Sequence, residues 1–336
     1  MGRDDTKKGS PMPSSRKKQS LLLLLLLCAM ACLPLLTCKE KGTPTKPSVR
    51  AALAANKPVQ KELRLLTYNV LVDRDFQKLR TKALFQILRR TKADVIALQE
   101  ADGWFVYPLL KQSWLRGKYH ITRYKGRPFA PGGQFILSRY PIVQTVWKIL
   151  PGRQRRTVVI ARIRVDGRIL AVATTHMESL PTDGPVRAKQ LDMMFSMLAK
   201  EKDAVLMGDF NFGYGAQPET RSLPSTYQDL WLTLHKGKPG FTWNIPQNPL
   251  AKVGSFKDEK SSRIDRILLR SAHWKPKTIQ IIGNRAIGQG RWYGRPYYHT
   301  GNKAIDNAHR DGLLMKVFPS DHYGLLGTIV TKGKNR

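Results

Sequence analysis

The chain has 336 residues, of which 41% are hydrophobic, and this is enough apolar material for one sizeable α/β domain. Its 58 Lys and Arg against 24 Asp and Glu give a formal net charge of +34, which favours polyanionic partners such as nucleic acid, anionic membrane surfaces or phosphorylated small molecules. The three cysteines, Cys28, Cys32 and Cys38, lie near the N-terminus, which excludes a disulfide framework and a cysteine-based zinc site for the rest of the chain.

Residues 1–38 are similar to a bacterial secretory signal. Basic residues within positions 1–20 precede an apolar run from Leu21 to about Leu36, which is slightly short for a membrane span. The end of this run resembles a lipobox and predicts lipidation of Cys38, with Cys32 as the second candidate and an uncleaved anchor as the other alternative. In each case we expect the rest of the chain outside the cytoplasm, membrane-anchored in the cell envelope or periplasmic or extracellular.

Residues 39–61 are rich in Lys, Pro, Thr and Ala and show no hydrophobic period, so they predict a flexible tether. A single catalytic domain is predicted over residues 62–332. The sequence shows neither an internal repeat nor a second linker that would divide this region further.

Apolar patterning predicts the elements of this domain in chain order. Continuous or alternating apolar runs predict strands, and apolar residues at helical spacing predict helices. Many strands with few helices indicate two sheets packed face to face with helices outside them. The predicted strands are Glu62–Asn69, Asp94–Glu100, Gln134–Leu137, Val158–Val165, Ile169–Thr175, Ala204–Met207, Ile264–Leu269 and Tyr323–Val330, and the predicted helices are Phe76–Arg90 and Val186–Lys200.

Several apolar strands end in a side chain that can bind a metal or move a proton. Asn69, Glu100, His176 and Asp209 all follow this pattern. Because side chains at strand ends converge on one rim of a sandwich, rigid strands can hold such groups in fixed positions for chemistry.

Together these segments resemble the endonuclease/exonuclease/phosphatase superfamily, especially tyrosyl-DNA phosphodiesterases and bacterial sphingomyelinases. The resemblance implies an α/β fold, a four-layer αββα sandwich of two mixed sheets with outer helices. It covers nearly the whole predicted domain and rests on segments that occur in the family's order. These segments are Thr67-Tyr68-Asn69, Leu98-Gln99-Glu100, Ile136–Pro141, Thr175–Ser179, Gly208-Asp209-Phe210-Asn211, Ile264–Ile267 and Ser320-Asp321-His322.

The resemblance implies a divalent metal ion, expected to be Mg²⁺ with Mn²⁺ as the alternative. A hard cation of this kind assists the hydrolysis of phosphate esters and prefers oxygen ligands from one or two carboxylates. The expected ligands are Glu100, Asn69 and Asp321.

The resemblance also implies the residues that act on water and phosphate. Asp209 would orient or deprotonate the attacking water, and Asn211 would hold that water or a phosphate oxygen. His322 would bind the phosphate while Asp265 orients its imidazole, and His176 would donate to the phosphate from the opposite side. The expected reaction is an in-line, mainly electrostatic hydrolysis.

The substrate is expected on loops above this rim, in the segment Gly283–Asp311. Its cationic and aromatic residues, represented by Arg291, Trp292 and Arg295, suit nucleic acid and predict a nuclease-like activity on DNA. The same composition also suits a lipid interface, so a phospholipid or sphingomyelin phosphodiesterase or a phosphatase is the alternative. A packed loop without a substrate role and a non-catalytic module that binds polyanions are the further alternatives, and no protein partner is inferred.

Overall fold

The computed structural model describes residues 61–296 and 302–333, which all belong to one compact unit, Pro58–Arg336. The predicted signal, the lipidation site at Cys38 and nearly all of the predicted tether lie outside the described residues. Within the described part of the chain, every helix is too short or too polar to cross a membrane.

Two mixed sheets of six strands each form the centre of the domain. In spatial order, the first sheet contains β11 (Trp274–Ile282), β14 (Gly324–Thr331), β1 (Glu62–Asn69), β2 (Val95–Gln99), β4 (Phe135–Ser138) and β3 (His120–Ile121). The second sheet contains β5 (Ile142–Ile149), β6 (Thr157–Val165), β7 (Arg168–His176), β8 (Asp203–Asp209), β10 (Asp265–Ser271) and β9 (Gln228–Asp229).

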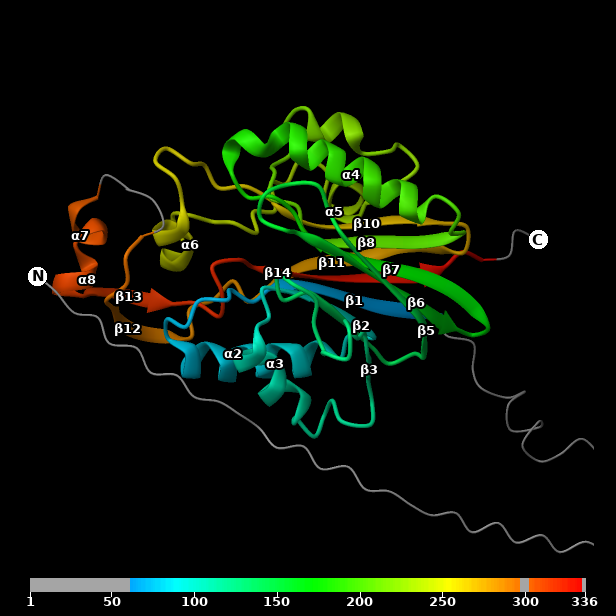
Figure 1. The fold of residues 1–336 in the computed structure, drawn as a ribbon, viewed down its shortest axis with the longest axis horizontal. Coiled ribbons are helices and arrows are strands. Elements are labelled where there is room, and N and C mark those ends of the chain that lie inside the picture. The colour runs from blue at the N-terminus through cyan, green and yellow to red at the C-terminus, as the bar shows by residue number, and fades with distance from the viewer. Residues whose placement is uncertain (1–60, 297–301, 334–336) are drawn as a thin grey trace, which may run out of the picture. The chain divides into compact units, whose positions relative to one another are not determined.

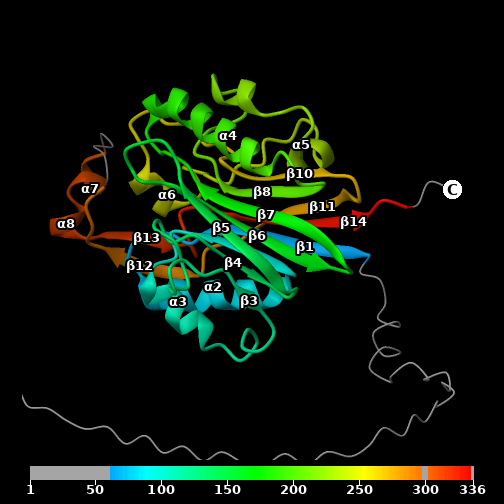
Figure 2. The same ribbon diagram turned by 45° about the vertical axis from the view of Figure 1, so that its right-hand side comes forward.

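Helices cover the outer face of each sheet, so the domain has four layers (Figures 1 and 2). The helices α2 (Gln77–Thr91) and α3 (Gly103–Leu110) lie on the first sheet, and α4 (Gly184–Leu198) lies on the second. The predicted four-layer αββα sandwich is therefore confirmed. The other elements include the short helices α5 (Leu230–Leu234), α6 (Pro249–Gly254), α7 (Lys303–Asp306) and α8 (Ala308–Asp311), and a two-stranded sheet of β12 (Gly288–Trp292) and β13 (Leu313–Val317).

Alternate residues of β1 enter different parts of the core, because successive side chains of a strand point to opposite faces. Leu65 packs between the sheets in the same cluster as Val205 and Ile267. Leu66 packs on the other face, in the cluster that includes Leu84 of α2. Both faces of the sheet are thus apolar, and each fully buried aliphatic side chain contributes ~1.5–3 kcal/mol.

All of the predicted strands and both predicted helices are present, with ends that shift by only a few residues. The long strands β5 and β11 were not expected from the sequence. Both lie at the edge of a sheet and expose part of their residues, and Pro276 interrupts the apolar pattern of β11. Their patterns are therefore weaker than those of the buried central strands.

Hydrogen bonds to the Asp203 carboxylate join the ends of β8, β10 and β11 at the edge opposite the predicted rim. The carboxylate of Asp203 accepts hydrogen bonds from the Ser271 hydroxyl and from the backbone N–H of His273, and its Oδ2 lies 2.7 Å from His273 Nδ1. Burial alone would raise the pKa of the Asp203 carboxyl, but these hydrogen bonds outweigh burial and hold the pKa below its ordinary value.

This depressed pKa predicts acid-dependent stability. The contribution of Asp203 is present above its unfolded pKa of ~3.9 and is lost as pH falls through the lower folded value. We expect Asp203→Asn to lower the thermal unfolding midpoint near neutral pH and to converge with the wild type as pH falls through the lowered folded pKa of Asp203. A difference between the two proteins that does not shrink in acid would contradict this assignment.

Candidate active site

Strand pairing brings the predicted site residues to one rim of the sandwich. In the first sheet β1 and β2 run parallel, so Asn69 lies opposite Gln99 and next to Glu100. In the second sheet β7 and β8 run parallel and pair His176 with Asp209, while antiparallel β10 places Asp265 opposite Asp209. The ends of these strands therefore meet across the gap between the two sheets.

The Asn69 side chain connects the two sheets. Its Nδ2 donates to Glu100 Oε1 at 3.0 Å and to Asp209 Oδ2 at 3.1 Å, while its Oδ1 accepts from the backbone N–H of Leu71 at 3.0 Å. The amide nitrogen, rather than the oxygen, thus faces the carboxylates. A role for Asn69 as an oxygen ligand of a metal would need the opposite orientation of this amide.

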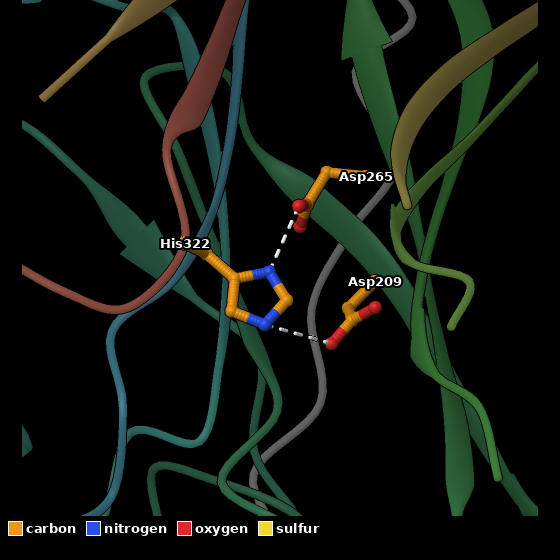
Figure 3. Close-up of side chains that lie close together, drawn as sticks. All are labelled: Asp209, Asp265 and His322. Carbon is orange, nitrogen blue, oxygen red and sulfur yellow. Dashed lines mark hydrogen bonds and ion pairs between the residues drawn. The ribbon is translucent and has the colours of Figure 1, made fainter. Parts of the chain in front are cut away.

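Asp265, His322 and Asp209 form a buried chain of polar groups (Figure 3). His322 Nδ1 lies 2.9 Å from Asp265 Oδ2, and His322 Nε2 lies 3.6 Å from Asp209 Oδ2. Burial would lower the pKa of His322, but the carboxylates of Asp265 and Asp209 outweigh burial and raise the pKa well above its ordinary value. His322 is therefore an imidazolium at neutral pH.

His176 has the opposite protonation state. Burial, together with the charges of Arg156 and His322, lowers the pKa of His176 well below its ordinary value. Arg156 Nη1 lies 2.9 Å from His176 Nδ1, and because arginine can only donate, Nδ1 must accept. The ring proton then sits on Nε2, which lies 3.3 Å from Asp209 Oδ2 and can donate to it.

Burial raises the pKa of the Asp209 carboxyl, although the positive charge of His322 opposes this effect. A carboxylate with a raised pKa is a better proton acceptor near neutral pH than an ordinary aspartate. The backbone N–H of Asn211 donates to Asp209 Oδ1 at 2.9 Å and keeps the carboxylate in its orientation. The Asn211 amide nitrogen itself donates to Met177 O at 2.9 Å, so it is committed to the backbone in this structure.

Asp321 lies beside the same rim, just before His322. Its Oδ1 accepts from the backbone N–H of His322 at 3.0 Å, and the preceding Ser320 hydroxyl donates to Asn69 O at 2.7 Å. Burial raises the pKa of Asp321, and the nearby carboxylate of Glu100 raises it further. The Asp321 and Glu100 side chains line the same cavity.

Arg80 of α2 holds the loop that follows β1. Its fully buried guanidinium donates to the carbonyl oxygens of Val70 and Leu71 at 2.7 Å each and to Pro319 O at 3.1 Å. The same loop presents the backbone N–H of Val72 to Glu100 Oε2 at 2.9 Å. One buried cation therefore fixes the segments on both sides of the site.

A cavity of about 690 Å³ opens above these groups. Glu100, His176, Asp209, Asp321 and His322 form part of its wall. The rest includes cationic and aromatic residues that carry no motif in the sequence: Tyr124, Arg127, Phe129, Arg156, Trp243 and Phe256. Strand pairing could have identified Arg156 as a site residue. Because β6 and β7 are antiparallel, the residue before Thr157 must lie near His176.

The predicted substrate residues Arg291, Trp292 and Arg295 do not line this cavity. Arg291 and Arg295 are exposed, and Arg295 lines a small hollow beside Asp321. Trp292 is only 3% exposed, packs in a hydrophobic cluster and donates its indole N–H to Asp75. Its predicted role in stacking on a substrate is therefore wrong, because the pairing of β12 with β13 turns the ring inward.

The protonation of His322 can be tested directly. Asp265→Asn removes the nearer carboxylate while burial of the ring remains, so we expect the pKa of His322 to fall and the imidazole to be neutral at pH ~7. Ring chemical shifts measured by NMR report this change, and Asp192→Asn on the exposed face of α4 is the matched control. A His322 pKa that is unchanged in Asp265→Asn would refute the assignment of the shift to Asp265.

Comparison with known proteins identifies relatives of this chain. The chain is 24% identical to tyrosyl-DNA phosphodiesterase 2 of Gallus gallus, over 78% of this chain and 65% of that protein. It is also 24% identical to the Homo sapiens protein of the same name, over 84% of this chain and 73% of that protein.

Solved structures share the fold at lower identity. D. rerio TDP2 complexed with single strand DNA product superposes with a TM-score of 0.61 at 22% identity, over 80% of this chain and 99% of that one. SmcL superposes with a TM-score of 0.57 at 19% identity, over 81% of this chain and 99% of that one. The model of the endonuclease/exonuclease/phosphatase family matches residues 66–322, which include every catalytic and metal-binding residue predicted above, and the chain therefore belongs to this family.

Proposed function

We propose that the protein is a Mg²⁺-dependent phosphodiesterase that hydrolyses phosphate esters of nucleic acid by attack of water. The observation that carries this proposal is the chain Asp265–His322–Asp209 at the wall of the cavity. It places an imidazolium, which can bind a phosphate, beside a carboxylate with a raised pKa, which can accept a proton from water.

The residues of the rim fit a divalent metal ion. Glu100 and Asp321 are hard oxygen donors that line the cavity, which is the chemistry that Mg²⁺ prefers, with Mn²⁺ as the alternative. Asp209, Asp265 and His322 also have donor atoms within 4.8 Å of one another, but two of these residues already pair with each other, since His322 Nδ1 lies 2.9 Å from Asp265 Oδ2. We therefore assign the ion to Glu100 and Asp321, where it would polarise the phosphate and stabilise the leaving oxygen.

The remaining groups bind and orient. Asp209 would accept the proton of the attacking water, and the Nε2–H groups of His322 and His176 would donate to phosphate oxygens on entry of the substrate. Arg156 holds His176 in the tautomer that this role requires. Positioned donors of this kind typically contribute about a hundredfold in rate each.

Nucleic acid is the proposed substrate class because cations and rings occur together at the cavity. Arg127 and Arg156 can contact phosphates, and Tyr124 and Phe129 can stack on unpaired bases. The names of the relatives, which are tyrosyl-DNA phosphodiesterases, favour the same class. Lipidation at Cys38 and export to the cell envelope remain part of the proposal. This proposed location is also what favours the second candidate, a phospholipid or sphingomyelin phosphodiesterase.

Parallel assays distinguish these candidates. Plasmid DNA, a 5′-tyrosyl oligonucleotide and sphingomyelin vesicles are incubated with the protein and Mg²⁺, and we expect cleavage of one or both DNA substrates. Asp209→Ala should reduce the rate at least about a hundredfold without loss of the fold, because it removes the proton acceptor. Vesicle hydrolysis without DNA cleavage would instead assign the lipid activity, and full activity of Asp209→Ala would disprove the site.

Metal binding can be measured without activity. A ligand that binds only the folded state raises the unfolding midpoint, so we expect millimolar Mg²⁺ to stabilise the wild-type protein. Glu100→Gln should abolish this stabilisation, whereas the exposed Asp192→Asn should retain it. The metal assignment fails if Glu100→Gln responds to Mg²⁺ as the wild type does.

A further inference from the structure

We propose that the groove between α2 and α3 binds single-stranded nucleic acid that extends from the catalytic cavity. This inference rests on the proposed function and adds a second contact surface to it. The two helices lie side by side on the outer face of the first sheet (Figure 1). They enclose a hollow of about 520 Å³, which is lined by Gln77, Lys78, Thr81, Lys82, Phe85, Gln86, Arg89, Trp104, Pro108, Gln112 and Trp114.

The charged residues that line this hollow are all basic. Lys78, Lys82 and Arg89 are exposed and lie at i, i+4 and i+11 of α2, so they share one side of the helix over ~16 Å. Acidic residues are absent from positions 76–93 and 103–165 of the sequence. This cationic row can therefore contact several successive phosphates of a strand.

Aromatic rings line the floor of the groove. Phe85, Trp104 and Trp114 are partly buried, and edge contacts hold them in place, such as Trp104 against Phe105 with ring centroids 5.8 Å apart and Trp114 against Tyr119 at 6.1 Å. Rings presented in this way can stack on bases while the lysines bind phosphate. A bilayer is a poorer fit, because insertion into a lipid interface needs protruding rings rather than recessed ones.

The groove and the catalytic cavity share a wall. The indole N–H of Trp104 donates to Val72 O at 3.1 Å, and the N–H of Val72 donates to Glu100 Oε2 at 2.9 Å. Val72 lines the catalytic cavity, and Trp104 lines the groove. A strand whose phosphate sits at the rim can therefore continue over Val72 onto α2 and α3.

Length-dependent binding tests this proposal. The affinity of the full-length protein for fluorescent oligothymidines of about 4 and about 12 nucleotides is measured by anisotropy in chelator, which prevents cleavage. We expect the longer strand to bind at least about tenfold more tightly. The double variant Lys78→Glu/Lys82→Glu and the single variant Trp114→Ala should each lose most of this gain, whereas Lys189→Glu/Lys200→Glu, the same charge change on the opposite helical layer, should retain it.

The outcomes separate this proposal from the proposed function. The groove proposal is wrong if the wild type binds both oligonucleotides equally tightly. It is also wrong if both groove variants keep the higher affinity for the longer oligonucleotide. Loss of binding to phosphatidylglycerol vesicles in the variants, with oligonucleotide affinity unchanged, would also overturn it and assign the face to a membrane. If the groove variants lose affinity but the wild type does not hydrolyse nucleic acid in Mg²⁺, the groove proposal stands and the proposed function is wrong. If the wild type hydrolyses nucleic acid but binds long and short strands equally, the proposed function stands and the groove proposal is wrong.

Discussion

The hydrogen bond from the Asn69 amide to the Asp209 carboxylate joins the two sheets at the rim of the sandwich. The contact between His322 and Asp265 makes a second polar connection across the same gap. Each buried polar group that loses its partner costs ~1–3 kcal/mol, so the sheets have little freedom to slide at this end. The geometry of the site and the packing of the two sheets therefore depend on each other, since the side chains proposed to act on substrate also hold the sheets in register.

Two histidines beside one carboxylate have opposite protonation states because their neighbours differ. His322 faces Asp265 and Asp209 and stays protonated, whereas His176 faces Arg156 and stays neutral. A site with both forms offers a fixed positive charge and a neutral donor at the same time. Motifs identify both residues as histidines of the rim, but only their contacts assign these states.

The residues around the site differ in how far sequence can predict them. Arg156 could have been found from the two consecutive predicted strands Val158–Val165 and Ile169–Thr175, because antiparallel pairing of such strands brings the start of one to the end of the other. Tyr124 and Phe129 lie in a loop without periodicity, and only the folded chain shows that they reach the cavity. Trp292 belongs to a segment whose composition suggests a substrate surface, yet pairing of β12 and β13 directs its ring into the core. Composition describes a segment, whereas the direction of a side chain depends on its partner strand.

By itself, the sequence determined the central strands, the two long helices, the four layers and the polar residues that end the strands. These features depend on local periodicity and on the rule that neighbouring strand ends converge, so they need no knowledge of distant contacts. Only the tertiary structure decided the orientation of the Asn69 amide, the burial of Trp292, the walls of the catalytic cavity and the groove between α2 and α3. Each of these depends on groups far apart in the chain, and their mutual placement is set by packing and by the need to pair buried polar atoms.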